Sequence, residues 1–186
     1  MGLVGLFVII FVIGMFASSS DSDSSSKENK QEINTTTNDS DEGKPDSEWY
    51  YSTDTDEMSG NNQYFAELIS ENQIEFEFPY SGGSKFKIIV RNMENRNDVL
   101  LVVDKGQFMT SIQGSENIKI KFDDISPEKY SYSSSSDGSQ DVVFLSRANE
   151  IIKKLKTSKK VMIEASFFQA GRKVIHFNTE NFNWEN

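Results

Sequence analysis

Apolar and polar residues form three successive patterns along this chain of 186 residues. Residues 1–17 contain no charged or strongly polar side chain, and residues 18–48 consist mainly of Ser, Asp, Asn, Glu, Thr and Lys. From Trp49 onward, apolar and polar residues alternate in short runs that are separated by turn-forming residues. These patterns predict three parts, namely an apolar segment at 1–17, a polar spacer at 18–48 and a folded domain at 49–186.

The apolar segment predicts contact with a membrane through residues 3–17. An apolar helix of this length reaches roughly 25 Å, at the lower end of what spans a bilayer core. A retained anchor is the favoured interpretation, because a cleaved secretory signal begins with basic residues and the first basic residue here is Lys27. Secretion after cleavage is the alternative, since a signal ending at Ser19 would place the small residue Ala17 two positions earlier.

The spacer predicts a disordered, acidic tether. Its only large apolar residue is Ile33, so it cannot bury enough surface to offset the entropy lost on ordering. A flexible chain of about thirty residues has a typical end-to-end distance near 30 Å. The acidic residues that follow the apolar segment favour a domain outside the cytoplasm, in the periplasm or at the cell surface.

The domain pattern predicts a mainly β fold of eight to ten strands with one helix, arranged as a β-sandwich or a flattened barrel. The alternation of apolar and polar residues places strands at 74–78, 86–90, 99–103, 108–112, 118–123, 130–132, 142–145, 161–168 and 173–179. Between the first two, Ser81–Ser84 predicts a hairpin turn, because its glycines tolerate positive φ. The helix is expected to begin after Ser146 as N-cap, with Ala148, Ile151, Ile152 and Leu155 on its buried face.

The residue inventory gives little support for catalysis, and no cofactor or metal is expected. One histidine and no cysteine make a zinc site of the usual kind improbable, and His176 fits a partly exposed strand position. A net charge of −10 gives no basic footprint for nucleic acid. The sequence therefore favours a protein that is not an enzyme.

Carboxylates are the remaining candidates for chemistry. The acids cluster as Asp54, Asp56 and Glu57, as Asp123-Asp124, and as Asp137 with Asp141. A glycoside hydrolase needs two carboxyl groups facing each other across a cleft. Acids in loops are more often turn formers, so a carboxylate-based hydrolase of envelope or host glycans is the alternative rather than the leading hypothesis.

Two loops are the expected binding surfaces, because recognition residues concentrate on loops that a rigid sheet carries. The first contains Tyr80, Gly82 and Gly83, and the second contains Asp54 and Asp56. Five lysines near the end of the expected helix are interpreted mainly as complements of its dipole, with an anion or an acidic partner as the alternative.

Several motifs together carry a resemblance to a known group of proteins. They are Trp49, Asp56-Glu57-Met58-Ser59-Gly60, Phe78-Pro79-Tyr80-Ser81-Gly82-Gly83, Lys105-Gly106-Gln107-Phe108, Phe122-Asp123-Asp124, Asp137-Gly138-Ser139 and Phe182-Asn183-Trp184. With them, the chain resembles an uncharacterised family of small exported bacterial proteins that are anchored at the N-terminus. More distantly, its layout is similar to periplasmic type VI secretion accessory proteins of the VasI kind. Neither resemblance supplies a functional residue.

The expected function is that of a membrane-tethered extracytoplasmic domain that binds an envelope protein or glycan. A structural protein of the envelope is a further alternative. Its binding face would be an edge strand rather than a loop.

Overall fold

The computed structural model describes residues 48–109 and 117–186. The predicted apolar segment and nearly all of the spacer lie outside these residues. The described part contains eleven strands and one helix. They are β1 (Tyr50–Thr55), β2 (Asn62–Ile69), β3 (Ile74–Phe76), β4 (Gly82–Ser84), β5 (Phe86–Met93), β6 (Arg96–Val103), β7 (Asn117–Phe122), β8 (Glu128–Ser134), β9 (Val142–Leu145), α1 (Ala148–Leu155), β10 (Lys160–Phe167) and β11 (Gly171–Asn178).

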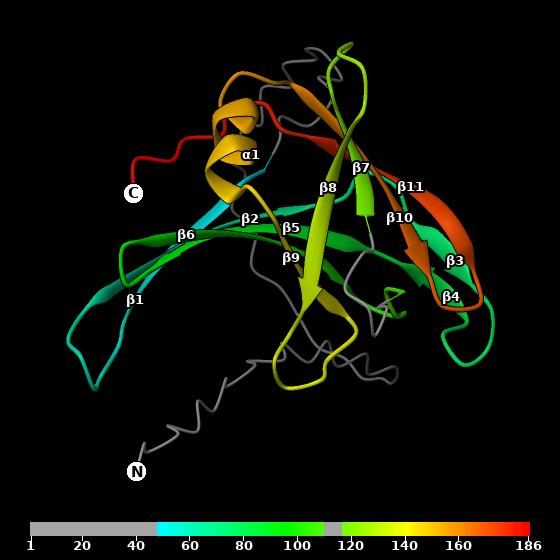
Figure 1. Ribbon diagram of the computed structural model, residues 1–186, viewed down its shortest axis with the longest axis horizontal. Helices are drawn as coiled ribbons and strands as arrows, with labels where there is room; N and C mark the ends of the chain where they lie inside the picture. Colours follow the sequence, from blue (N-terminus) through cyan, green and yellow to red (C-terminus); the bar gives the residue numbers. More distant parts are fainter. Residues whose placement is uncertain (1–47, 110–116) are drawn as a thin grey trace, which may run out of the picture. The chain divides into compact units, whose positions relative to one another are not determined.

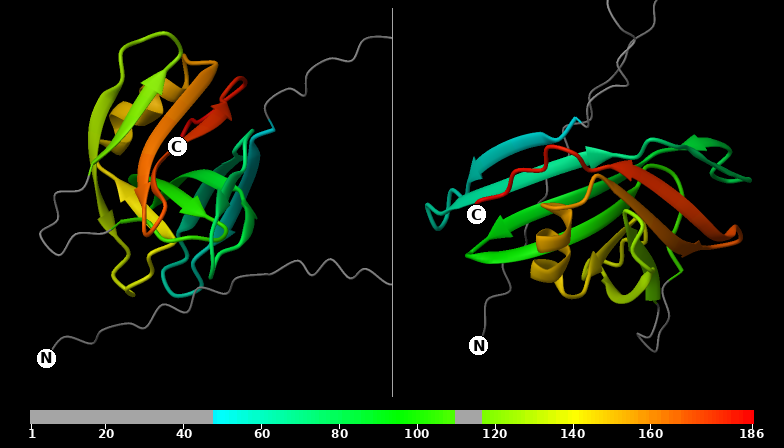
Figure 2. Two further views of the ribbon diagram at one scale, coloured as in Figure 1. Left: turned by 90° about the vertical axis from the view of Figure 1, so that its right-hand side faces the viewer. Right: turned by 90° about the horizontal axis from the view of Figure 1, so that it is seen from above.

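Nine strands form one antiparallel sheet in the order β1-β2-β5-β6-β9-β8-β7-β10-β11, and β3 pairs with β4 in a separate hairpin. The sheet is strongly curved, so that the strands from β7 to β11 stand over those from β1 to β6 (Figures 1 and 2). The prediction of a mainly β domain with one helix is confirmed for the described residues. The strands exceed the expected eight to ten, because β1, β2 and β4 fall in stretches where the pattern predicted no strand.

Buried and exposed residues alternate along the strands, and the buried ones form the core. In β10, Val161, Ile163, Ala165 and Phe167 are buried, and the residues between them are more exposed. Their register partners continue the buried face, since Val161 lies opposite Phe122 and Ile163 opposite Ile120. Because successive side chains of a strand point to opposite faces, one face of the curved sheet lines the core and the other meets solvent.

Aromatic rings fill the core around Phe167. Its ring centroid lies 5.0 Å from that of Phe108, 5.3 Å from Phe76 and 5.4 Å from Phe86. Gly106, at φ 138°, allows this packing, because a Cβ there would lie 3.1 Å from the Phe76 ring. Such separations match the tilted and edge-to-face contacts that aromatic rings prefer.

Two predictions about strands and turns need correction. The turn predicted at Ser81–Ser84 is wrong, because Gly82 and Gly83 belong to β4 and pair with Phe76 and Glu75. The chain instead reverses at residues 77–80, where the Tyr80 amide donates to the Glu77 carbonyl (2.9 Å) and the peptide bond between Phe78 and Pro79 is cis. The expected strand at 108–112 is represented only by an isolated bridge between Phe108 and Phe167, and positions 110–112 lie outside the described residues.

The helix forms where it was expected, but its predicted N-cap is wrong. Arg147 occupies the N-cap position at φ 58°, and no side chain caps the helix there. The buried face is as predicted, with Ile151, Ile152 and Leu155 in the core. Packing of this apolar face against the sheet stabilises a helix of only eight residues, which would be marginal alone.

A charged network fastens the helix to β8. The Lys154 ammonium lies 2.6 Å from Glu128, 3.0 Å from Glu150 and 3.0 Å from the hydroxyl of buried Tyr130. Burial alone would lower the pKa of Lys154, but these three hydrogen bonds together raise it above its usual value. The Arg147 guanidinium stacks 3.9 Å from the Tyr130 ring centroid. Of the lysines near the helix end, Lys154 is therefore engaged within the fold.

The two edges of the large sheet, β1 and β11, are held in different ways. Along β11, the Asn72 side chain donates from Nδ2 to the Val174 carbonyl (3.0 Å) and accepts from the His176 amide at Oδ1 (2.8 Å). The Glu71 amide donates to the His176 carbonyl at 2.8 Å. The residues after β2 thus take the place of a neighbouring strand along β11.

The chain after β11 packs beside β1 at the opposite edge. Phe182 and Trp184 are buried, and the Phe182 ring centroid lies 4.4 Å from that of Trp49. The Tyr51 hydroxyl accepts a hydrogen bond of 2.8 Å from the amide of Asn183. The C-terminal residues therefore anchor β1 through side chains rather than through backbone pairing.

Candidate functional site

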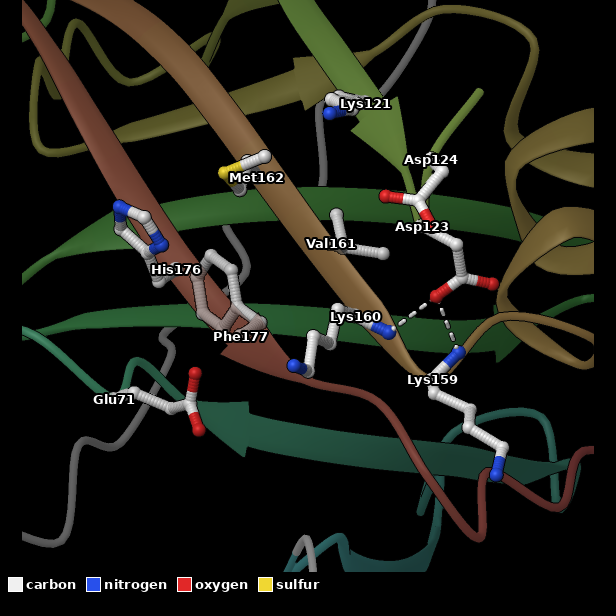
Figure 3. Close-up of a pocket in the computed structure, with 10 residues that line it drawn as sticks. All are labelled: Glu71, Lys121, Asp123, Asp124, Lys159, Lys160, Val161, Met162, His176 and Phe177. Carbon is white, nitrogen blue, oxygen red and sulfur yellow. Dashed lines mark hydrogen bonds between the residues drawn. The ribbon is translucent and has the colours of Figure 1, made fainter. Parts of the chain in front are cut away.

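A hollow of about 380 Å³ lies on the solvent-facing side of β7, β10 and β11. Figure 3 shows the residues that line it, which come from these three strands, from the turn after β7, from the residue before β10 and from Glu71. They are Glu71, Lys121, Asp123, Asp124, Lys159, Lys160, Val161, Met162, His176 and Phe177. The hollow is open to solvent, so it suits a protruding group of a partner better than an enclosed small molecule.

The floor of the hollow is a cross-strand row. Met162 of β10 lies opposite Lys121 of β7 and opposite His176 of β11. All three side chains lie on the face of the sheet opposite the core. The register therefore places the apolar side chain of Met162 between the Lys121 cation and the His176 imidazole. The contacts of Asn72 and Glu71 with His176 fix β11 and bring Glu71 to the rim.

Asp123 builds the wall of the hollow. Its Oδ1 accepts hydrogen bonds from the amides of Lys159 (2.9 Å) and Lys160 (2.8 Å), and its own amide donates to the Lys160 carbonyl (2.8 Å). These bonds join the end of β7 to the start of β10, while Asp123 itself holds a positive φ of 46°. The Asp123 carboxylate is thus bonded to the backbone and has a structural role.

The hollow mixes both signs of charge. Lys159 forms a loose ion pair with Glu180 at 3.8 Å. Within the described residues, Lys121 and Lys160 form no ion pair closer than the 4.0 Å limit of a salt bridge. Figure 3 shows their ammonium groups on different sides of Met162, with Asp124 on the side of Lys121 and Glu71 on the side of Lys160. The arrangement offers two cations and an apolar contact to an incoming acidic group.

The loop residues predicted as a binding surface fall into two separate places. Asp54 and Asp56 lie in the hairpin that precedes β2, whereas Tyr80, Gly82 and Gly83 lie in and before β4. The hairpin opens β2 and the β3–β4 segment follows its end, so the two groups stand at opposite ends of the sheet (Figure 1). Tyr80 also packs against the core. The structure therefore does not bring these residues into one site, and their role in binding stays a prediction.

The acidic loop clusters form turns. Asp56 Oδ1 accepts from the amides of Ser59 (2.7 Å) and Met58 (2.9 Å), and the Ser59 amide is the main reason that the pKa of Asp56 is lowered. Asp137 likewise accepts from the Ser139 amide at 2.9 Å, which lowers its pKa. No group of three or more His, Cys, Asp or Glu side chains is placed to hold a metal ion in the described parts of the chain.

Sequence reasoning missed the hollow because its members are far apart in the chain. Lys121, Met162 and His176 each read as ordinary outward positions of an alternating strand. Only the pairing register of β7, β10 and β11 shows that they are neighbours. The one available signal was the excess of lysines around the start of β10. These lysines had been interpreted mainly as complements of the helix dipole.

Comparisons with known proteins found no similar protein. No protein-family model, no curated protein and no solved structure matches the chain. The resemblance to exported bacterial proteins stays a prediction. In residues 48–109 and 117–186, no helix has the length and apolar character needed to cross a bilayer.

Proposed function

We propose that this protein is a membrane-tethered binding domain, held outside the cytoplasm, that recognises an acidic group on an envelope protein through the hollow on β7, β10 and β11. In this proposal residues 1–17 form an apolar helix and residues 18–48 a disordered spacer. The domain is interpreted as a flattened barrel, which the Asn72 contacts between the end of β2 and β11 support. It needs no catalytic step.

The pair Lys121 and Lys160 carries the proposal. Both ammonium groups line the hollow without an ion pair in the described structure, although acids outnumber basic residues by 29 to 19 in the whole chain. A carboxylate of a partner would gain a charge-assisted hydrogen bond from either ammonium group. Met162 adds apolar area between strands that are already rigid, so little ordering would oppose binding.

The experiment compares two double variants of the full-length protein in cells. Lys121→Gln with Lys160→Gln removes both cations of the hollow. Lys153→Gln with Lys156→Gln makes the same change of charge on exposed residues of the helix end and serves as the matched control. A photo-reactive residue at exposed Asp124 records the partner by cross-linking and mass spectrometry.

A specific envelope protein should cross-link to the wild type and to the control. Its yield should fall about tenfold or more in the hollow variant, which corresponds to roughly 1.4 kcal/mol of lost binding energy. Equal yields from all three proteins would refute the hollow as the site. Absence of any specific cross-link to the wild type would refute the binding function itself.

A further inference from the structure

The strand β1 ends the large sheet and leaves one row of backbone groups unpaired. It pairs with β2 on one side, from Tyr50 opposite Glu67 to Thr55 opposite Asn62. On its other side, no backbone–backbone hydrogen bond involves β1 within the described residues. Unpaired N–H and C=O groups at a sheet edge are a template for another strand.

This edge has only one of the features by which proteins usually prevent strand addition, the charged residue Asp54. Lys, Arg and Pro are absent from β1, and its register with β2 runs without a bulge. Edges are usually blocked by charged residues, proline or bulges, or by a covering segment such as the one that Asn72 provides for β11. The exposed edge of β1 instead presents Tyr50 and Tyr51, which are 67% and 44% exposed.

A second hollow, of about 440 Å³, lies at the start of β1 and extends over β2 and β5, on the paired side of β1. It is lined by Glu48, Trp49, Tyr50, Glu67, Ile69 and Lys87. Ile69 in this hollow is 57% exposed, so it offers an apolar contact to a side chain of a partner. An added strand would place alternate side chains beside Tyr50, which lines this hollow, and such side-chain contacts are how strand addition acquires specificity.

The edge is held rigid before any partner binds. The hydrogen bond from Asn183 to the Tyr51 hydroxyl and the contact between Trp49 and Phe182 fix β1 from the core side. A preformed strand loses little entropy when another strand joins it. The ordering cost therefore falls mainly on the incoming segment.

The charges around the edge define the partner. Between Glu48 and Asn62 the chain contains the acids Glu48, Asp54, Asp56 and Glu57 and no basic residue. We propose that β1 accepts, as an additional strand, an extended segment of another protein that carries basic and apolar residues in alternation. A second copy of the chain is a poor occupant, because antiparallel pairing of two β1 strands about Ser52 would place Asp56 of one copy near Glu48 of the other.

The test uses the full-length protein in detergent micelles and three synthetic peptides of about ten residues, the upper length of a common strand. The first peptide alternates Lys and Val, with blocked ends. The second replaces every Lys by Glu. The third keeps the Lys–Val sequence but has N-methyl groups on alternate amides, which prevents backbone pairing without changing its charge.

Fluorescence anisotropy should show binding of the Lys–Val peptide and at least tenfold weaker binding of the other two. Ser52→Lys, which puts a cation in the middle of β1, should weaken binding about tenfold or more, whereas Ser126→Lys, in an exposed loop, should not. Hydrogen exchange of the β1 amides in the wild type should slow when the peptide binds. Unchanged exchange of the core strands in the free Ser52→Lys protein should show that this variant remains folded.

Three results would overturn the proposal. The N-methylated peptide could bind as well as its parent, in which case charge alone drives association. All three peptides could bind more weakly than about 1 mM, a free energy of only about 4 kcal/mol. Sedimentation could instead show a dimer of the wild type that Ser52→Lys dissociates, in which case the edge pairs with a second copy.

Discussion

The two edges of the nine-stranded sheet differ in how their outer backbone groups are treated. At β11, a side chain and a backbone amide from the segment after β2 occupy the groups that a further strand would use. At β1, the C-terminal residues support the strand from the core side and leave its backbone edge open. The difference shows that a strand can be exposed to solvent without having a free backbone edge. β11 is such a strand, because its side chains line a surface hollow while its edge is covered.

The strongest way to break this comparison is to remove the support of β1. Trp184 is 3% exposed and stacks near Phe182, whose ring contacts Trp49. Trp184→Ala should lower the free energy of unfolding by about 3–5 kcal/mol, as truncation of a buried aromatic residue does. Urea unfolding of the full-length protein measures the loss. Phe168→Ala, at a site 51% exposed, is the control and should change it by less than about 1 kcal/mol.

Loss of the β11 closure should have a smaller effect. Asn72→Ala removes two hydrogen bonds and leaves the His176 amide and the Val174 carbonyl without their side-chain partner. The expected loss is about 1–3 kcal/mol. Hydrogen exchange at the His176 amide should accelerate, whereas Asn61→Ala in the exposed hairpin should leave it unchanged. Equal exchange in both variants would show that Asn72 does not close this edge.

The smallest effect concerns acid sensitivity on the β11 side. The hydrogen bond from Lys119, at 2.9 Å, holds the pKa of Glu164 below its ordinary value of 4.5, and Arg172 assists. Stability from this group is therefore present above pH 4.5 and disappears as the pH falls through the lowered native pKa. Glu164→Gln should reduce the loss of stability between about pH 5 and pH 3. Glu77→Gln, an exposed carboxylate without an ion pair in the described residues, should retain the wild-type pH profile.

Alternation predicted the later strands well because both faces of those strands have clear characters. β10, β11 and the buried face of α1 follow from residues such as Ile163, Ile175 and Leu155. β1 was missed because its residues are nearly all exposed, so no apolar alternation marks it. β4 was missed because Gly82 and Gly83 are typical of turns, and only pairing with β3 makes them a strand.

The candidate site was harder to predict than the fold. Local sequence marks which side of a strand Lys121 or His176 occupies, but not which strands are neighbours. Asn72 covers the edge of β11 by bonding to His176, which lies 104 residues away in the chain. No local sequence pattern predicts this contact. The turn-forming role of the loop acids could be predicted, since an Asp two or three residues before an amide commonly accepts its hydrogen bond.

The Asn72 closure also has a consequence for how the chain folds. Joining residues 72 and 176 requires a segment of 104 residues to be closed, so this contact costs chain entropy that local contacts do not. Folds rich in such distant contacts form slowly. During synthesis, the edge at Asn72 has no partner until β11 has been made. The sheet therefore cannot close along this edge until β11, the last of its strands in chain order, has been synthesised.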